Sequence, residues 1–268
     1  MRDFWNACNH EAEKSHAGYR WHRCTLADLP VPVLDALAKA VPGHFIVPAS
    51  FRNTGNGAAL AESLAARMPD LSGTKNATID RGGDLGELTA IEWLKTGRAG
   101  SWDVCYSLRW KESPRPRRGE DIVAIRWSDH PVGLLKGEAK AGTYIGNGTL
   151  TDARSRLNKD GGWPSRFTID FLSERLSLEG RVAEAERLYN ERFVNRPQAL
   201  QPGCSHLLFL LSPADPSGRV PAHAPAPAGT PQEQFGTVFL CTEYEQLRDR
   251  LFSRAIELVQ HPNHADAD

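Results

Sequence analysis

Two short apolar segments, residues 121–127 and 132–140, constrain this fold more than any other part of the chain. Both have the length and the β-branched or aliphatic character of strands, and the four residues between them, Ser-Asp-His-Pro, are typical of a turn. A four-residue loop fixes the register of such a hairpin and places Trp127 opposite Val132. The sequence therefore predicts a β-hairpin with a defined pairing of its two strands.

The same register gathers three charged residues near the open end of the hairpin. It places Asp121 directly opposite Glu138, and Lys140 shares a face with Glu138 because side chains alternate along a strand. Two opposed carboxylates repel each other, and a divalent cation between them removes that repulsion. Mg²⁺ prefers oxygen ligands and can activate a bound water, while a neighbouring lysine stabilises developing negative charge. These residues predict a metal site suited to phosphodiester hydrolysis.

An exposed hairpin with scattered surface charges is the alternative, because a Glu-x-Lys triplet occurs by chance in most chains. The apolar residues of both segments argue for a strand pair buried on both faces: Ile122, Val123, Ile125, Leu134 and Leu135. Charges in such a place are costly unless they are paired or bind a metal. We therefore expect Mg²⁺, or Mn²⁺, as the cofactor.

The pattern resembles the motif of the PD-(D/E)XK nuclease superfamily, in which Glu-x-Lys ends the second strand. Here Asp121 is followed by Glu-Ala-Lys at 138–140, and Glu120 stands where the motif has its proline. The wider pattern resembles the nuclease subunit (HamA type) of Hachiman anti-phage defence systems over roughly residues 80–180. Three segments carry this likeness: Arg81-Gly-Gly-Asp-Leu-Gly-Glu87, Gly119-Glu-Asp121 and Gly137-Glu-Ala-Lys140.

The resemblance implies an α/β fold, with a central mixed β-sheet flanked by helices around a PD-(D/E)XK restriction-endonuclease-like core. It also implies a magnesium-dependent deoxyribonuclease that works in antiviral defence and is controlled by a helicase subunit of the same system. A DNA-binding or scaffold subunit with a vestigial nuclease site is the alternative function.

PD-(D/E)XK sites often take a further acidic ligand from the helix before the hairpin, which the sequence predicts over residues 84–95. Three carboxylates compete for this role. Glu87 lies on the apolar stripe that should face the sheet, Glu92 lies on a more polar side, and Asp84 can cap the helix start. A capping box with Asp84 is the other interpretation of Glu87. We predict Asp121, Glu138 and Glu87 as metal ligands, with Lys140 as a further catalytic residue.

Basic residues on either side of the hairpin are candidate DNA contacts: Arg115, Arg117, Arg118, Arg154, Arg156 and Lys159. The first three lie in a proline-stiffened loop at 111–118, for which a solvated hairpin tip is the alternative. The other three lie in, or just beyond, a helix predicted at 151–158. Helices after the Glu-x-Lys strand often line the DNA groove in this superfamily.

Composition limits the broad class of protein. The 268 residues suffice for a sizeable core, and we expect an N-terminal supporting region over 1–78 and a nuclease core over 79–268 with a proline-rich excursion at 212–232. The net charge of −1 means that DNA binding needs a local basic patch. Five scattered cysteines, and no apolar run typical of a signal peptide or a membrane span, favour a cytoplasmic protein.

The first residues carry Cys8, His10, His22 and Cys24, whose spacing matches no standard zinc pattern. We therefore expect a loosely structured arm and one strand over 19–24. A second short strand is predicted at 44–47.

Overall fold

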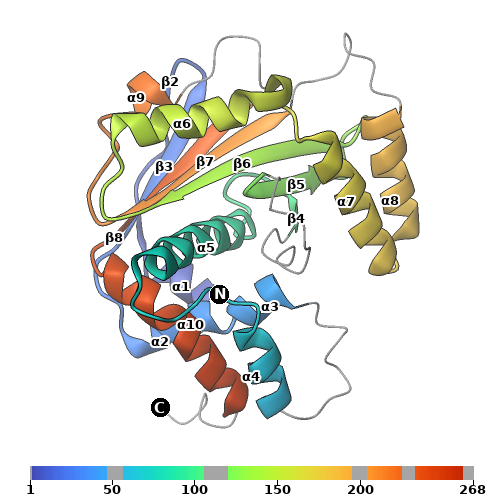
Figure 1. The fold of residues 1–268 in the computed structure, drawn as a ribbon. Coiled ribbons are helices and arrows are strands. Elements are labelled where there is room, and N and C mark those ends of the chain that lie inside the picture. The colour runs from blue at the N-terminus through green and yellow to red at the C-terminus, as the bar shows by residue number, and fades with distance from the viewer. Residues whose placement is uncertain (1, 47–56, 106–119, 195–203, 225–232, 262–268) are drawn as a thin grey trace.

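A computed structural model describes residues 2–46, 57–105, 120–194, 204–224 and 233–261 of the chain. These residues form an α/β fold in which one mixed β-sheet lies between two layers of helices (Figure 1). The strand order is β1-β3-β8-β7-β6-β5-β4, and β2 pairs with β3. The predicted class, a central mixed sheet flanked by helices, is confirmed.

Eight strands of the described residues make this sheet: β1 (Asn9–His10), β2 (Lys14–His16), β3 (Tyr19–Leu26), β4 (Asp103–Cys105), β5 (Ile122–Arg126), β6 (Gly133–Ala141), β7 (Ser205–Ser212) and β8 (Gln234–Cys241). Strands β6, β7, β8 and β3 are parallel, whereas β4, β5 and β6 form an antiparallel meander. Strand β3, from the predicted supporting region, therefore pairs directly with a strand of the predicted core. The division of the chain into those two parts remains a prediction.

One face of the sheet, here named the α5 face, carries the largest apolar core. The helices below the sheet in Figure 1 cover it: α1 (Arg2–Asn6), α2 (Val31–Ala38), α3 (Val41–Phe45), α4 (Gly57–Ala65), α5 (Lys75–Leu94) and α10 (Tyr244–Gln260). The predicted strand at 44–47 is wrong, because α3 continues to Phe45; Ile46 follows in an extended conformation, and residue 47 lies outside the described part of the chain. Proline in the first turn favours this short helix.

The opposite face, here named the α6 face, carries two smaller apolar clusters. Its elements are α6 (Asn147–Asn158), the 3₁₀ turn η3 (Lys159–Gly162), α7 (Arg166–Leu178), α8 (Val182–Tyr189), the π-turn η4 (Asn190–Val194) and α9 (Val220–His223). Helix α9 lies within the predicted proline-rich excursion, of which residues 225–232 fall outside the described part of the chain.

The β5–β6 hairpin has the predicted register. Ile122 pairs with Gly137 and Arg126 pairs with Gly133, so continuing the ladder by one residue sets Asp121 against Glu138. The strand pair is also buried on both faces, as predicted, because Ile122 and Ala124 join one core cluster and Val123 and Ile125 join another. Gly137 permits this pairing: a Cβ atom there would lie 2.8 Å from Cβ of Ile122.

Helix α5 begins nine residues before the predicted start, so the capping-box interpretation of Asp84 and Glu87 is wrong. Thr74 is the N-cap, and its side chain accepts a hydrogen bond from the backbone N–H of Ala77. The glycines that resemble a helix boundary serve close packing instead. At Gly86, an added Cβ would lie 3.1 Å from Cβ of Ala141, so this glycine lets α5 approach β6 closely.

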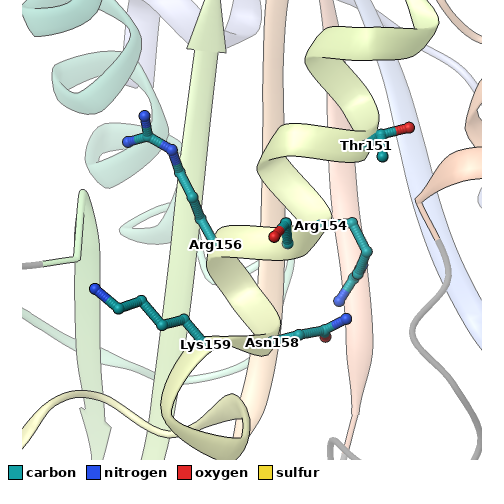
Figure 2. A pocket seen from close by; sticks show the side chains of 6 residues that line it. Thr151, Arg154, Arg156, Asn158 and Lys159 are labelled. Carbon is teal, nitrogen blue, oxygen red and sulfur yellow. The ribbon is translucent and has the colours of Figure 1, made fainter.

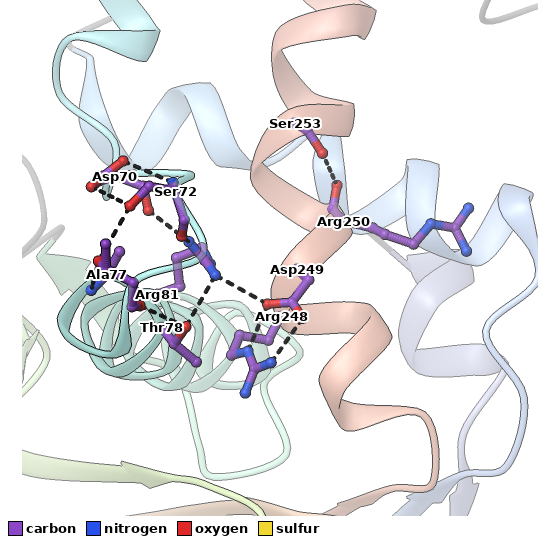
Figure 3. A network of polar contacts seen from close by, with 10 residues as sticks. Asp70, Ser72, Ala77, Thr78, Arg81, Arg248, Asp249, Arg250 and Ser253 are labelled. Carbon is purple, nitrogen blue, oxygen red and sulfur yellow. Dashed lines mark hydrogen bonds and ion pairs between the residues drawn. The ribbon is translucent and has the colours of Figure 1, made fainter.

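A buried arginine anchors the N-terminal half of α5 (Figure 3). Arg81 donates hydrogen bonds to the carbonyl oxygens of Asp70 and Ser72, 2.7 and 2.8 Å away, and forms an ion pair with Asp249 of α10 at 3.3 Å. These contacts connect α5 to the preceding loop and to the C-terminal helix. The Arg81 segment of the sequence pattern therefore supports the position of α5 against the sheet.

Candidate metal site

Two carboxyl groups meet where the β5–β6 hairpin opens. Oδ2 of Asp121 accepts a hydrogen bond of 3.1 Å from the backbone N–H of Ala139, which fixes this carboxyl group beside the strand that carries Glu138. Glu138 is buried, with 4% of its surface exposed. The hairpin thus presents two oxygen-bearing side chains together, as the predicted register requires.

The two carboxyl groups of this pair strongly influence each other's ionisation. Burial, and then repulsion from Asp121, raises the pKa of Glu138 from 4.5 to about 7. Burial also raises the pKa of Asp121. Two carboxyl groups this close resist being ionised together, and a divalent cation between them would reverse that effect.

Lys140 completes the predicted set of three charged groups. Its Nζ atom lies 2.8 Å from Oε1 of Glu138 and 3.0 Å from Oδ2 of Asp152. Burial alone would lower the pKa of Lys140, but its interactions with Glu138 and Asp152 outweigh burial and raise the pKa. The side chain is therefore a stable ammonium group beside the carboxyl pair.

Helix α6, which packs over this face of the sheet, adds two residues to the site, Asp152 and Arg156. The Nε atom of Arg156 lies 3.5 Å from Oε1 of Glu138 and 3.2 Å from Oδ2 of Asp152. Sequence reasoning missed Asp152, because an aspartate four residues before an arginine looks like an ordinary surface ion pair on a helix. The i,i+4 spacing of Asp152 and Arg156 was the available signal in the sequence. The contact between Asp152 and Lys140, which belongs to β6, shows that Asp152 is also part of the site.

The donor set fits Mg²⁺ or Mn²⁺, which bind oxygen ligands and commonly use one or two protein carboxylates. The Oε1 atom of Glu138 is buried and accepts no hydrogen bond of good geometry from the described residues, although two cations lie at ion-pair distance. The ion pair with Lys140 at 2.8 Å compensates part of the cost of burying this oxygen, and a bound cation would compensate it further. Asp121 and Glu138 are the residues that would hold the metal.

The structure does not assemble Glu87 with these two carboxylates. Glu87 is half-buried on α5, which packs on the other face of the sheet through Gly86. Among the described residues, including the N-terminal cysteines and histidines, no three Asp, Glu, His or Cys side chains are arranged to hold a metal ion. The role of Glu87 as a third metal ligand remains a prediction.

Glu92 and Asp84, the other two residues considered as the third metal ligand, are both buried within α5. Glu92 is buried, and its Oε1 atom lies 2.6 Å from Nε2 of His44 and 2.6 Å from Nζ of Lys95. It thereby connects α5 to α3. Asp84 is buried in the middle of the helix rather than at its start.

The predicted DNA contacts divide into three groups. Arg115, Arg117 and Arg118 lie outside the described residues. Arg156 and Lys159 are exposed, and both line a pocket of about 560 Å³ beside α6. They extend to one side of the helix in Figure 2, whereas Arg154 and Asn158 extend to the other.

Arg154 is buried beneath α6 rather than presented to solvent. Its Nη1 atom lies 3.1 Å from Nδ1 of His206, whose Nε2 atom lies 2.8 Å from the carbonyl oxygen of Gly162. Burial lowers the pKa of His206 to about 4, so this imidazole is neutral and can accept from Arg154 while it donates to Gly162. Arg154 therefore supports the turn after α6.

A second buried ion pair, which sequence reasoning also missed, lies next to the site. Nζ of Lys136 is 3.8 Å from Oε1 of Glu120 and donates to the carbonyl oxygens of Lys159 and Trp163. Glu120 also accepts a 2.8 Å hydrogen bond from the backbone N–H of Ser165, at the start of α7. The residue that replaces the motif proline thus connects the metal-site hairpin to α7.

No helix within the described ranges combines the length and the apolar character that a bilayer crossing requires. The family model that matches the chain is HamA, and the match covers residues 8–222. That range contains the whole β5–β6 hairpin and α6, so the metal-site residues all lie within it. No curated protein matches the chain.

Proposed function

The chain belongs to the HamA family, whose members are a subunit of the Hachiman anti-phage defence system, and we propose that it is the metal-dependent DNA nuclease of that system. The observation that carries this proposal is the buried pair Asp121 and Glu138 with Lys140 beside it. Their charges, their burial and their place on the hairpin support a phosphodiester-hydrolysis site of the PD-(D/E)XK kind. The mixed sheet, with Glu-x-Lys at the end of the second hairpin strand, supports a core of that type.

In the proposed mechanism, Asp121 and Glu138 hold Mg²⁺, or Mn²⁺, through one carboxylate each. A divalent ion held by these two residues would supply Lewis-acid chemistry, which lowers the pKa of a water ligand and polarises a phosphoryl oxygen. Lys140 holds a positive charge next to Glu138, where it can orient the attacking water or stabilise the negative charge that develops on the phosphate. Burial of the carboxylates strengthens each of these electrostatic interactions.

The substrate we propose is DNA, positioned over α6. Arg156 and Lys159 are exposed and extend to the same side of this helix (Figure 2), and Arg156 lies 3.5 Å from Glu138. Each can contact a backbone phosphate. Arg115, Arg117 and Arg118 precede Asp121 in the sequence and are proposed as further contacts. The two exposed basic residues on α6 form only a small positive patch, which predicts a modest intrinsic affinity for DNA.

We propose that a helicase subunit of the same system supplies the targeting. A chain of net charge −1 does not attract DNA over its whole surface, so a partner that engages DNA would deliver the substrate and restrain the nuclease. A nuclease without restraint would damage the DNA of its own cell. The proposed setting for both subunits is the cytoplasm.

The test is cleavage of supercoiled plasmid DNA by the purified protein, with and without its helicase partner. We expect cleavage with Mg²⁺, none with EDTA, and none from Glu138→Gln or Lys140→Met at unchanged thermal stability. Glu186→Gln, at an exposed position on α8, is the matched control and should cut like the wild type. Cleavage that persists in Glu138→Gln, or a wild type that fails to bind Mn²⁺ and cuts nothing with its partner, would favour a scaffold subunit with a vestigial site.

A further inference from the structure

Four side chains form a closed arrangement of alternating charge between β6 and α6. Lys140 lies between Glu138 and Asp152, at 2.8 and 3.0 Å, and Arg156 lies between the same two carboxylates, at 3.5 and 3.2 Å. Both cations therefore divide their interaction between a buried carboxylate on the strand and an exposed one on the helix. Glu138 contributes the same oxygen, Oε1, to both contacts.

The two carboxylates differ sharply in their surroundings. The side chain of Asp152 is 54% exposed, whereas that of Glu138 is 6% exposed. A buried anion attracts nearby cations more strongly than an exposed one, because less water screens the interaction. Without Asp152, Glu138 would be the remaining carboxylate within ion-pair distance of Lys140 and Arg156 among the described residues.

That change would matter at the oxygen where a metal has to bind. Glu138 Oε1 accepts no well-aligned hydrogen bond, so it retains a free lone pair even though both cations are close. If Lys140 and Arg156 turned fully toward Glu138, a divalent cation would have to displace or repel two positive charges. Asp152 counteracts this by attracting both cations toward solvent.

We propose that Asp152 is a positioning residue of the metal site, which holds Arg156 closer to itself than to Glu138 and shares Lys140 with that carboxylate, and so keeps Glu138 available to the metal. The proposal rests on the proposed function of the Asp121–Glu138 pair. Asp152 is not itself assigned as a metal ligand, because no three His, Cys, Asp or Glu side chains among the described residues are arranged to hold a metal ion. Its side chain is 54% exposed, so we expect substitution to leave the fold intact.

The test measures Mn²⁺ binding to the full chain, without DNA, through the electron paramagnetic resonance signal of free Mn²⁺. Asp152→Asn removes the charge at constant shape, and we expect it to weaken Mn²⁺ affinity by roughly tenfold, as for side chains coupled through direct contact. Asp152→Glu should restore part of the loss. Asp170→Asn, an exposed aspartate on α7, is the matched control and should bind as the wild type does.

A double variant separates positioning from other roles. Adding Arg156→Gln to Asp152→Asn removes one of the two competing cations, so Mn²⁺ affinity should return to near the wild-type value. If Asp152 were a metal ligand or a fold-supporting residue, the second substitution would not help, and that result would overturn the proposal. Wild-type affinity in Asp152→Asn alone would also overturn it.

The same measurements distinguish this inference from the proposed function. If the wild type binds Mn²⁺ in a manner that depends on Glu138 but not on Asp152, the metal site stands and only the positioning role is lost. If Glu138→Gln binds Mn²⁺ as tightly as the wild type, the metal site is wrong and the role of Asp152 is overturned with it.

Discussion

The carboxylate of Asp121 is bound to the backbone of Ala139, with 3.1 Å between Oδ2 and the amide nitrogen. A backbone donor cannot rotate away as a side chain can, so one proposed ligand is held on the strand that carries the other. The pair is therefore preorganised even though its two negative charges repel. That repulsion should be measurable as a dependence of stability on pH.

The first prediction concerns this pH dependence. The pKa of Glu138 is raised from 4.5 to about 7 by burial and by Asp121, so between these values the folded protein holds a proton that the unfolded chain has lost. The pair's contribution to stability is complete below the lower value and is lost as the pH rises through about 7. Urea unfolding in EDTA should show this decline, and Glu138→Gln should reduce it.

Excess Mg²⁺ is the complementary measurement to that pH series. A cation that binds the folded state alone stabilises it, so Mg²⁺ should raise the wild-type unfolding midpoint most at alkaline pH, where both carboxylates are ionised. Glu138→Gln should respond little. An equal response in both proteins would contradict the assignment of the pair as a metal site.

The second prediction concerns the third ligand. With the capping box excluded, Glu87→Gln should leave stability nearly unchanged and should abolish DNA cleavage if Glu87 reaches the metal when substrate binds. Glu92→Gln is the contrasting variant: it weakens a buried contact with His44 and should lower the free energy of unfolding by about 1–3 kcal/mol. Full activity in Glu87→Gln would remove this residue from the site.

The third prediction distinguishes the roles of the exposed and the buried basic residues in and just after α6. Replacing Arg156 or Lys159 with Ser should reduce the salt dependence of DNA binding by roughly 0.9 in log–log slope for each lost phosphate contact. Binding is best measured with Ca²⁺, whose looser coordination positions the nucleophile less well. Arg154→Met should instead lower stability, because Arg154 donates to His206 beneath the helix. A salt slope unchanged in both the Arg156 and the Lys159 variant would return α6 to an ordinary solvated surface.

The fourth prediction concerns the buried pair Glu120 and Lys136. Glu120→Ala leaves the Lys136 ammonium buried without its carboxylate and removes an acceptor from the start of α7, so the free energy of unfolding should fall by about 3–5 kcal/mol in urea denaturation. Adding Lys136→Met should recover part of the loss, since the unpaired charge is then gone. A double variant as unstable as the sum of the two single variants would argue against a coupled pair.

The sequence was most informative where local rules and the fold agree. The length of the 128–131 turn and the apolar flanks sufficed to predict the register that sets Asp121 against Glu138, because a slip by one residue would turn every side chain of the slipped strand to the opposite face of the sheet. The start of α5 was not predictable in the same way. Gly82 and Gly83 resemble a helix boundary, whereas the need for glycine at Gly86 comes from β6, which is distant in sequence.

The missed residues share one physical reason. Asp152 and Lys136 are ordinary polar residues in their own segments, and each pairs with a residue outside its own element. Asp152 pairs with Lys140 of β6, and Lys136 pairs with Glu120, which precedes β5. Arg154 could have been placed from helical phase, since it follows the buried Ala153 and lies one turn after the buried Leu150. Its buried position shows that a basic residue of α6, the helix proposed to face DNA, can instead support the turn that follows the helix.

The pairing of β3 with β8 has a consequence for how the protein is made. These strands are far apart in the sequence, and they pair in parallel along their full length. During synthesis β3 can pair with β8 only after the whole intervening segment, including the β5–β6 hairpin, has been made. Contacts of such high sequence separation form slowly, because loop-closure entropy must be overcome first. The complete sheet, and with it the support of β6 by its neighbouring strands, therefore forms only after β8 has emerged from the ribosome.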